Sequence, residues 1–272
     1  NSAVDMDQAM NQFIASTGLA KEGTDYWRDS LEQIYADNYG EDFADIAEAM
    51  ATVKKEVGAF DSAELTSLVE SGFTLRDVFG YDIPESARAA KAMMDSFGVS
   101  GEEAMNLIAA GAQNGLDYSG ELIDSISEYS VQFAKVGLSA ADMFNIFQTG
   151  AETGAWNLDK IGDAVKELAI RVVDGSDTTA EGFELIGLNA EEMAAKFAAG
   201  GESAREAFYQ TVEALSALED PLAQNTAGVN LFGTMWEDLG PEVVTQLASI
   251  QDGIYATGEE MENLKEVKYD DL

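Results

Sequence analysis

The chain has 272 residues, 46% of them hydrophobic, with 51 acidic and 15 basic residues and neither histidine nor cysteine. The hydrophobic fraction excludes a wholly disordered acidic chain, and the net charge of −36 disfavours binding to nucleic acid or to anionic lipid. The missing histidine and cysteine exclude disulfides, Ser–His and Cys–His nucleophile systems and most zinc sites.

Helical periodicity runs through nearly the whole chain and is interrupted mainly by glycine. Apolar residues recur at steps of three and four, for example at Phe43, Ile46, Met50, Val53 and Val57. We therefore predict an all-α fold, a multi-helix globular array of short and medium amphipathic helices without a substantial sheet. The expected spans are 3–17, 24–38, 41–57, 61–71, 84–97, 100–114, 119–136, 139–153, 158–173, 178–186, 189–199, 202–218, 222–232 and 241–264.

Three of the corners between these helices share one sequence pattern. In each corner a glycine takes the left-handed conformation that ends a helix, and the apolar residue after it folds back onto that helix. Ser or Asn then caps the next helix, and a carboxylate three positions later completes a capping box. The uneven spacing of the three corners argues against a strict solenoid. Their residues are Gly98, Ser100 and Glu103; Gly137, Ser139 and Asp142; and Gly187, Asn189 and Glu192.

A division into two parts is predicted at the turn that precedes Pro84, where a proline begins a helix. It separates an N-terminal helical segment, 1–80, from a helical module, 81–272. The turn 174–177 is a second candidate boundary. Because the chain begins with Asn1 and not with Met, we expect an excised or processed piece. No apolar run of about 18 residues is present, so no membrane-spanning segment is expected.

Paired carboxylates are the feature that comes closest to catalytic machinery. A glycosidase needs two carboxylates about 5–10 Å apart across a cleft. Here each pair stands at an expected helix start or on an exposed face, where the helix dipole or solvent stabilises the charge. We therefore predict no catalytic residue and no enzymatic activity. The pairs are Glu41/Asp42, Glu102/Glu103, Glu191/Glu192 and Glu259/Glu260.

The segment 174–179 with Glu181 faintly resembles a calcium loop. It lacks the glycine at the sixth position, and Leu185 stands where a bidentate glutamate is required. An N-cap at Ser176 or Asp177 is the favoured interpretation. Because no phosphate-binding glycine motif is present either, we predict no metal site and no cofactor.

Methionine and tryptophan are expected mainly in the core. Met93, Met94 and Met105 are predicted to fill gaps between alanine-rich helices, although an adaptable binding groove is the alternative. The tryptophans are predicted to anchor either the core or an interface. They are Trp27, Trp156 and Trp236.

The segment Gly228–Pro241, with Leu231, Phe232 and Gly233 at its centre, resembles an element of phage and prophage tail tape measure proteins, in the minor tail protein family. The corners at 97–104 and 133–140 and the segment 147–155 resemble repeated elements of the same family. The resemblance covers about residues 85 to 255, and 1–80 resembles no family that we can name.

The resemblance implies a structural, non-enzymatic component of a phage-type tail, present here as a fragment of a longer protein. Such proteins set the tail length during assembly, lie in the tail lumen and are ejected when the genome is delivered. The implied partners are tail tube, tail-tip and tail assembly chaperone proteins and further copies of the chain, without specific binding to nucleic acid. The implied location is the virion tail, after synthesis in the host bacterial cytoplasm.

Two other classes of function stay open at this point. One is an acidic helical interaction module of a bacterial surface or secreted protein. The other is a peptidoglycan-cleaving domain, for which loss of activity on changing a glutamate such as Glu121 would be required.

Overall fold

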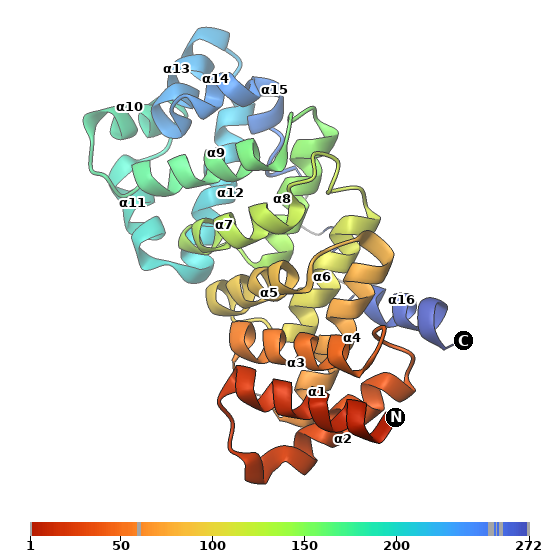
Figure 1. Ribbon diagram of the computed structural model, residues 1–272. Coiled ribbons are helices and arrows are strands. Elements are labelled where there is room, and N and C mark those ends of the chain that lie inside the picture. Colours follow the sequence, from red (N-terminus) through yellow and green to blue (C-terminus); the bar gives the residue numbers. More distant parts are fainter. Residues whose placement is uncertain (1, 59–60, 250–252, 254, 256–257, 271–272) are drawn as a thin grey trace. The chain divides into compact units, whose positions relative to one another are not determined.

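The computed structural model describes residues 2–58, 61–249, 253, 255 and 258–270, and all of its regular elements are helices (Figure 1). This confirms the predicted all-α class. The chain forms two compact units: unit 1 comprises residues 1–95, 99–110 and 258–272, and unit 2 comprises 96–98 and 111–257. The sequence-based division into the segment 1–80 and the module 81–272 stays a prediction.

Unit 1 is built from the N-terminal helices and from one helix at the far end of the sequence. Helix α1 packs along α3, α2 packs against α4, and α16 returns to lie on α4. Its elements are α1 (Ser2–Thr17), the 3-10 helix η1 (Lys21–Gly23), α2 (Thr24–Ala36), α3 (Phe43–Val57), α4 (Ser62–Phe79), most of α5 (Ile83–Phe97), most of α6 (Gly101–Gln113) and α16 (Glu260–Tyr269).

Unit 2 places α7 against α9 and α10 against α13, while α11 packs on α12. A group of phenylalanines fills its centre, and the rings of Phe133 and Phe147 meet edge to face at 5.3 Å. Its elements are α7 (Leu122–Lys135), α8 (Ala140–Glu152), α9 (Leu158–Arg171), α10 (Asp177–Leu185), α11 (Ala190–Ala199), α12 (Gly201–Ala217), α13 (Pro221–Phe232), α14 (Met235–Leu239) and α15 (Pro241–Val244).

Most of the predicted core residues are buried. Met93 and Met105 are fully enclosed, Trp27 and Trp236 are buried, and Met94 is half-buried. Trp156 differs, because its side chain is 84% exposed. A place in the core is therefore wrong for Trp156, and the interface role stays a prediction.

Two expected helices differ from the structure. The helix predicted for 61–71 continues as α4 to Phe79, because Phe73 and Leu75 extend its buried face past Gly72. The single helix predicted for 241–264 is wrong. Its place is taken by the four-residue α15, turns up to residue 249, and the separate α16. Gly258 has φ +74°, a left-handed conformation that separates α16 from the preceding chain.

Candidate functional site

The corner before α6 carries a reciprocal capping box. Gly98 has φ +72°, in the left-handed region where glycine is favoured. The backbone N–H of Glu103 donates to Ser100 Oγ at 3.1 Å, and the backbone N–H of Ser100 donates to Glu103 Oε2 at 3.1 Å. These two bonds satisfy donors at the first turn of α6 that have no partner within the helix.

The corner between α7 and α8 combines a helix stop with a helix start. The backbone N–H of Leu138 donates to Phe133 O at 3.1 Å, and that of Gly137 donates to Ala134 O at 2.9 Å. This is the Schellman arrangement. Ser139 and Asp142 then form a complete capping box, with bonds of 2.9 and 3.1 Å.

The third corner, between α10 and α11, has the same helix stop but only half of the box. Asn189 Oδ1 accepts from the backbone N–H of Glu192 at 2.9 Å. The Glu192 carboxylate lies instead 3.5 Å from Lys196 Nζ, one turn further along α11. The predicted return bond is therefore replaced by an exposed ion pair.

Asp142 does more than cap a helix, because its carboxylate is buried at the centre of a polar cluster. It accepts from Arg205 Nε at 2.8 Å, from Arg205 Nη2 at 3.0 Å and from the Tyr209 hydroxyl at 3.0 Å. Burial by itself would raise the pKa of Asp142, but the bonds from Arg205 and the Ser139 N–H hold the pKa below its ordinary value. The carboxylate is thus kept ionised and ties α8 to α12.

Gly137 permits the close approach on which this cluster depends. A Cβ at Gly137 would lie 2.2 Å from Gly201 O and 2.6 Å from the backbone N of Arg205. Its φ of +77° also favours glycine. The corner therefore fits against the first turn of α12 only without a side chain at this position.

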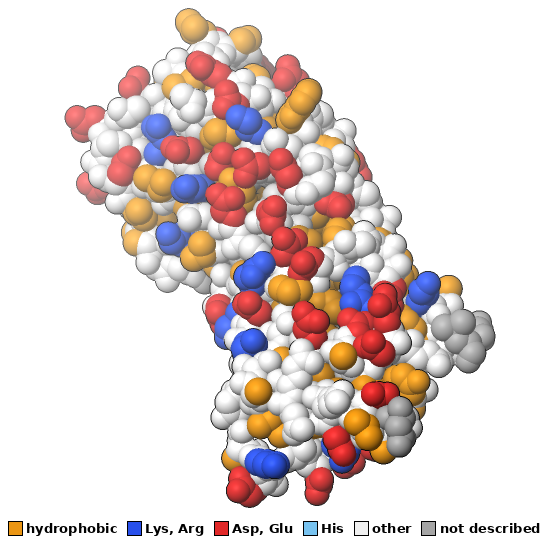
Figure 2. Space-filling model, in the orientation of Figure 1, with side chains coloured by type: hydrophobic (Ala, Val, Ile, Leu, Met, Phe, Trp, Pro, Cys, Tyr) orange, Lys and Arg blue, Asp and Glu red, His pale blue; other side chains and the backbone are white. Residues whose placement is uncertain are grey.

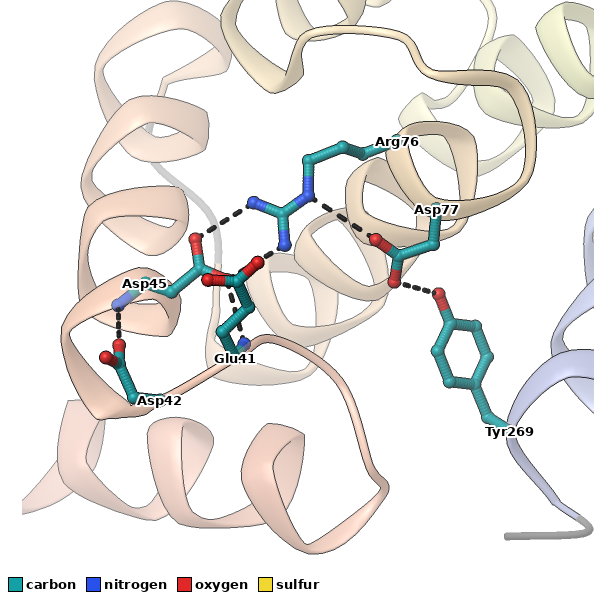
Figure 3. Close-up of polar contacts among 6 residues, drawn as sticks. All are labelled: Glu41, Asp42, Asp45, Arg76, Asp77 and Tyr269. Atoms are coloured by element: carbon teal, nitrogen blue, oxygen red, sulfur yellow. Dashed lines mark hydrogen bonds and ion pairs between the residues drawn. The ribbon is translucent and has the colours of Figure 1, made fainter.

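A second polar cluster lies in unit 1 and is drawn in Figure 3. Arg76, near the end of α4, donates to Asp45 through Nη1 at 2.9 Å and Nη2 at 2.8 Å. Its Nε lies 3.5 Å from Asp77 Oδ1, and Asp77 Oδ2 accepts from the Tyr269 hydroxyl at 2.8 Å. The cluster joins the start of α3, the end of α4 and the end of α16.

The ionisation in this cluster follows from its contacts. Hydrogen bonding from Arg76, only partly opposed by burial, holds the pKa of Asp45 below its ordinary value. Burial, together with the bond to Asp77, raises the pKa of Tyr269. At neutral pH the Asp45–Arg76 pair is therefore charged and Tyr269 is a neutral phenol donor, an arrangement that holds the three helices together.

A hollow of about 420 Å³ beside α16 contains a carboxyl with unusual ionisation. Burial raises the pKa of Glu70 to about 7, Lys265 opposes that shift, and Asp37 and Glu262 add to it. Asp37, Glu70, Glu262 and Lys265 all line the hollow. Glu70, in the hollow beside α16, therefore changes its protonation near neutral pH.

The motif around Phe232 is a tightly packed turn. Leu231 and Phe232 are fully buried, and Gly233 has φ +61°. Arg171 Nη1 donates to Asn230 O at 3.3 Å, which places a cation at the C-terminal end of α13, where the helix dipole favours it. A Cβ at Gly233 would meet Arg171 Nη2 at 2.7 Å.

The same turn folds Trp236 back onto α13. The indole Nε1 donates to Asn225 Oδ1 at 2.9 Å. A Cβ at Gly228 would lie 2.2 Å from the indole ring, so the ring packs directly on the helix backbone. The turn at Gly233, together with the buried rings of Phe232 and Trp236, thus holds α9, α13 and α14 together.

Comparison with known proteins identifies the family. The sequence profile of the family described as "Phage-related minor tail protein" matches residues 33–233, so the match ends at the glycine of the Leu-Phe-Gly element. The chain belongs to this family. The match also extends into the segment 1–80, where the sequence alone showed no resemblance.

A relative gives a more specific likeness. The "Probable tape measure protein" of Streptomyces phage phiC31 is 34% identical over 171 residues, which is 62% of this chain and 24% of that protein. The chain thus spans about a quarter of the length of this relative. No solved structure matches the chain. As a member of this family, the chain is a structural component of a phage-type tail and thus of the virion.

The carboxylate pairs of this minor tail protein lie at helix starts, where they were expected. Asp42 caps α3, and the other pairs stand at the cap or in the first turn of α6, α11 and α16. Ser176 caps α10, as the favoured interpretation of the calcium-like segment had it. In the part of the chain that the structure describes, no group of three or more acidic residues is arranged to hold a metal ion, and no helix is long and apolar enough to cross a bilayer.

Most residues of the clusters were missed by the sequence reasoning, and Arg205, Tyr209 and Tyr269 show why. Arg205 and Tyr209 are one helical turn apart, and Arg205 is one of only 15 basic residues in a very acidic chain. That scarcity was the available signal, because a cation in such a chain is a natural partner for a buried carboxylate. Nothing local pointed to Tyr269, which meets Asp77 from 192 residues away.

Proposed function

We propose that this minor tail protein is part of a tape measure protein, which sets the tail length during assembly, lies in the tail lumen and is ejected ahead of the genome. The observation that carries the proposal is its 34% identity over 171 residues to the probable tape measure protein of phage phiC31. The tail tube, the tail tip, the assembly chaperones and further copies of the chain are the proposed partners, and the host bacterial cytoplasm is the proposed place of synthesis.

The charge distribution supports a place in the lumen. The net charge is −36, and acidic side chains are spread over the visible face of the molecule (Figure 2). Two carboxylates that are drawn inward, those of Asp45 and Asp142, are neutralised by arginine forks. A surface of this kind repels DNA phosphates, so the protein would not retain a genome that passes through the same channel.

Tail length in a phage that encodes this chain tests the proposal. We expect an in-frame deletion of residues 33–233 to give particles with shorter tails in electron micrographs, because a tape measure fixes length through its own extent. As a control, the Leu222→Ala variant of the intact protein should give tails of normal length, since this side chain is 75% exposed. Deletion particles with full tails of normal length would refute the proposal.

DNA binding by the purified chain tests the charge argument separately. We expect no shift of a fluorescent DNA duplex at about 100 mM salt, where phosphate contacts dominate non-specific affinity. Saturable binding under these conditions would remove the physical reason for placing the chain beside the genome.

A further inference from the structure

Trp156 is the most exposed of the large apolar side chains in the described part of the chain, at 84%. It lies in unit 2, in the corner between α8 and α9. An indole of this size in water forgoes the stabilisation that burial gives, and tryptophan is the residue type most enriched among the anchors of protein interfaces. An exposed tryptophan of this kind is typical of a residue that a binding partner covers.

The backbone that carries Trp156 is held on both sides. The N–H of Ala155 donates to Gly150 O at 2.8 Å, and Ala155 O accepts from the Tyr118 hydroxyl at 2.9 Å. On the other side, Asn157 caps α9 by accepting from the Lys160 N–H at 2.9 Å. The backbone that carries the indole is thus fixed by hydrogen bonds, so this segment would lose less conformational entropy on binding a partner.

Two carboxylates of α9 follow this aromatic corner closely in the sequence. Asp159 and Asp163 follow Trp156 at steps of three and four along α9, and each carboxylate lies 2.7 Å from the Tyr129 hydroxyl. A hydroxyl carries one hydrogen and donates to one acceptor at a time, so the pair retains unused acceptor capacity. Figure 2 shows acidic side chains gathered over α7 and α9 in unit 2.

Glu121, at the start of α7, adds to the same negative field. Its charge contributes, after burial, to raising the pKa of Tyr118, which places it close to the phenol that supports Ala155. Its Oε2 is buried without a hydrogen-bond partner. Lys160, the cation nearest in sequence, is engaged with Asp238 at 3.2 Å.

We propose that this surface, formed by Tyr118, Glu121, Trp156, Asp159 and Asp163 and here named the Trp156 surface, docks an arginine- or lysine-bearing segment of a partner protein. Cations stack favourably on indole faces, and the carboxylates supply the charge complement. An anionic membrane is repelled by the same carboxylates, and a second copy of the chain would bring its own large negative charge. The proposal does not depend on the tape measure role.

The test uses the whole chain and a twelve-residue peptide of alternating arginine and serine, with fluorescence anisotropy at about 100 mM salt. We expect Trp156→Ala to weaken binding about 10-fold and Trp156→Phe to weaken it less, because the cation–π contact with the indole is lost in the first variant and only reduced in the second. Leu222→Ala, which removes another exposed apolar side chain of unit 2, should leave the affinity unchanged.

A matched pair of charge variants separates the surface from the overall acidity. Asp159→Asn with Asp163→Asn should weaken peptide binding several-fold more than Glu181→Gln with Glu184→Gln, which changes the net charge equally at exposed positions of α10. Equal losses for the two double variants, or equal binding by wild type and Trp156→Ala, would overturn the proposal. Sedimentation that shows a dimer abolished by Trp156→Ala would overturn it in favour of a second copy.

Discussion

The two units hold their helices with the same device, a bidentate arginine–aspartate pair at a capped helix start, but they bury it differently. In unit 2 the Asp142 side chain is 3% exposed, whereas in unit 1 Asp45 is 21% and Arg76 31% exposed. Arg205, at 27%, is about as exposed as Arg76, so the difference lies in the carboxylates, and water screens the second pair more than the first. The comparison teaches that the same contact pattern contributes more to the free energy of unfolding in unit 2, where its carboxylate is buried, than in unit 1.

The largest expected effect comes from removing the buried carboxylate. Asp142→Ala should lower the free energy of unfolding by about 4 kcal/mol, because it strands Arg205 and Tyr209 without their acceptor. Asp45→Ala should cost about 1 kcal/mol, as expected for a partly exposed pair. Urea unfolding followed by circular dichroism measures both. Equal losses would show that burial does not separate the two clusters.

A glycine exchange sharpens the comparison at the level of the backbone. Gly137→Ala should destabilise the protein by about 3 kcal/mol, because strain in the left-handed region adds to an overlap with Gly201 O. Gly98→Ala meets no atom within 4 Å and should cost about 1 kcal/mol from strain alone. Thermal melts of the two variants measure the difference between their stability losses. Equal losses would show that the α7–α8 corner is loosely packed against α12.

Glu70 in unit 1 and Asp142 in unit 2 should contribute to stability with opposite dependence on pH. The folded pKa of Glu70, about 7, exceeds its ordinary value of 4.5, so the folded state of unit 1 binds more protons than the unfolded state between these values. Stability from Glu70 is therefore full below about pH 4.5 and declines as the pH rises towards 7. The lowered pKa of Asp142 acts the other way, and the stability that it contributes is lost in acid, as the pH falls below the ordinary value of 3.8.

Glu70→Gln should flatten the decline in melting temperature between pH 5 and 7.5. Glu48→Gln, an exposed change on α3, is the control and should leave the slope as it is in the wild type. A slope that Glu70→Gln leaves unaltered would show that Glu70 is not the group that titrates under α16.

The smallest stability effect is expected at Trp156. Trp156→Ala should change the free energy of unfolding by less than about 0.5 kcal/mol, since surface substitutions rarely exceed that. Trp236→Ala, at a side chain that is 1% exposed, should cost about 4 kcal/mol. A large loss at Trp156 would mean that the indole is buried in solution, which would contradict its role as a docking anchor.

Local signals explain what the sequence predicted well. Ser139 with Asp142, Asn189 and Ser176 are caps that act within three residues, and the structure has each of them at a helix start. Gly72 misled the prediction because burial of Phe73 and Leu75 outweighs a helix cost of about 1 kcal/mol for glycine.

Long-range contacts explain what the sequence did not predict. Arg205 reaches Asp142 across 63 residues, and α16 meets Asp77 through Tyr269 across 192. No periodicity encodes such pairings, because they depend on how separate helices come together. The choice between core and interface for Trp156 stayed open for the same reason: a single tryptophan next to a helix start has the same local pattern whether another helix covers it or not.

The length of tails assembled with a duplicated segment tests the proposed function most directly. With residues 33–233 present twice in tandem in the encoding phage, we predict tails longer by roughly 40 Å if the added copy stays folded, and by up to about 300 Å if it extends as one continuous helix. Infectious particles whose tails keep their original length would contradict a tape measure role.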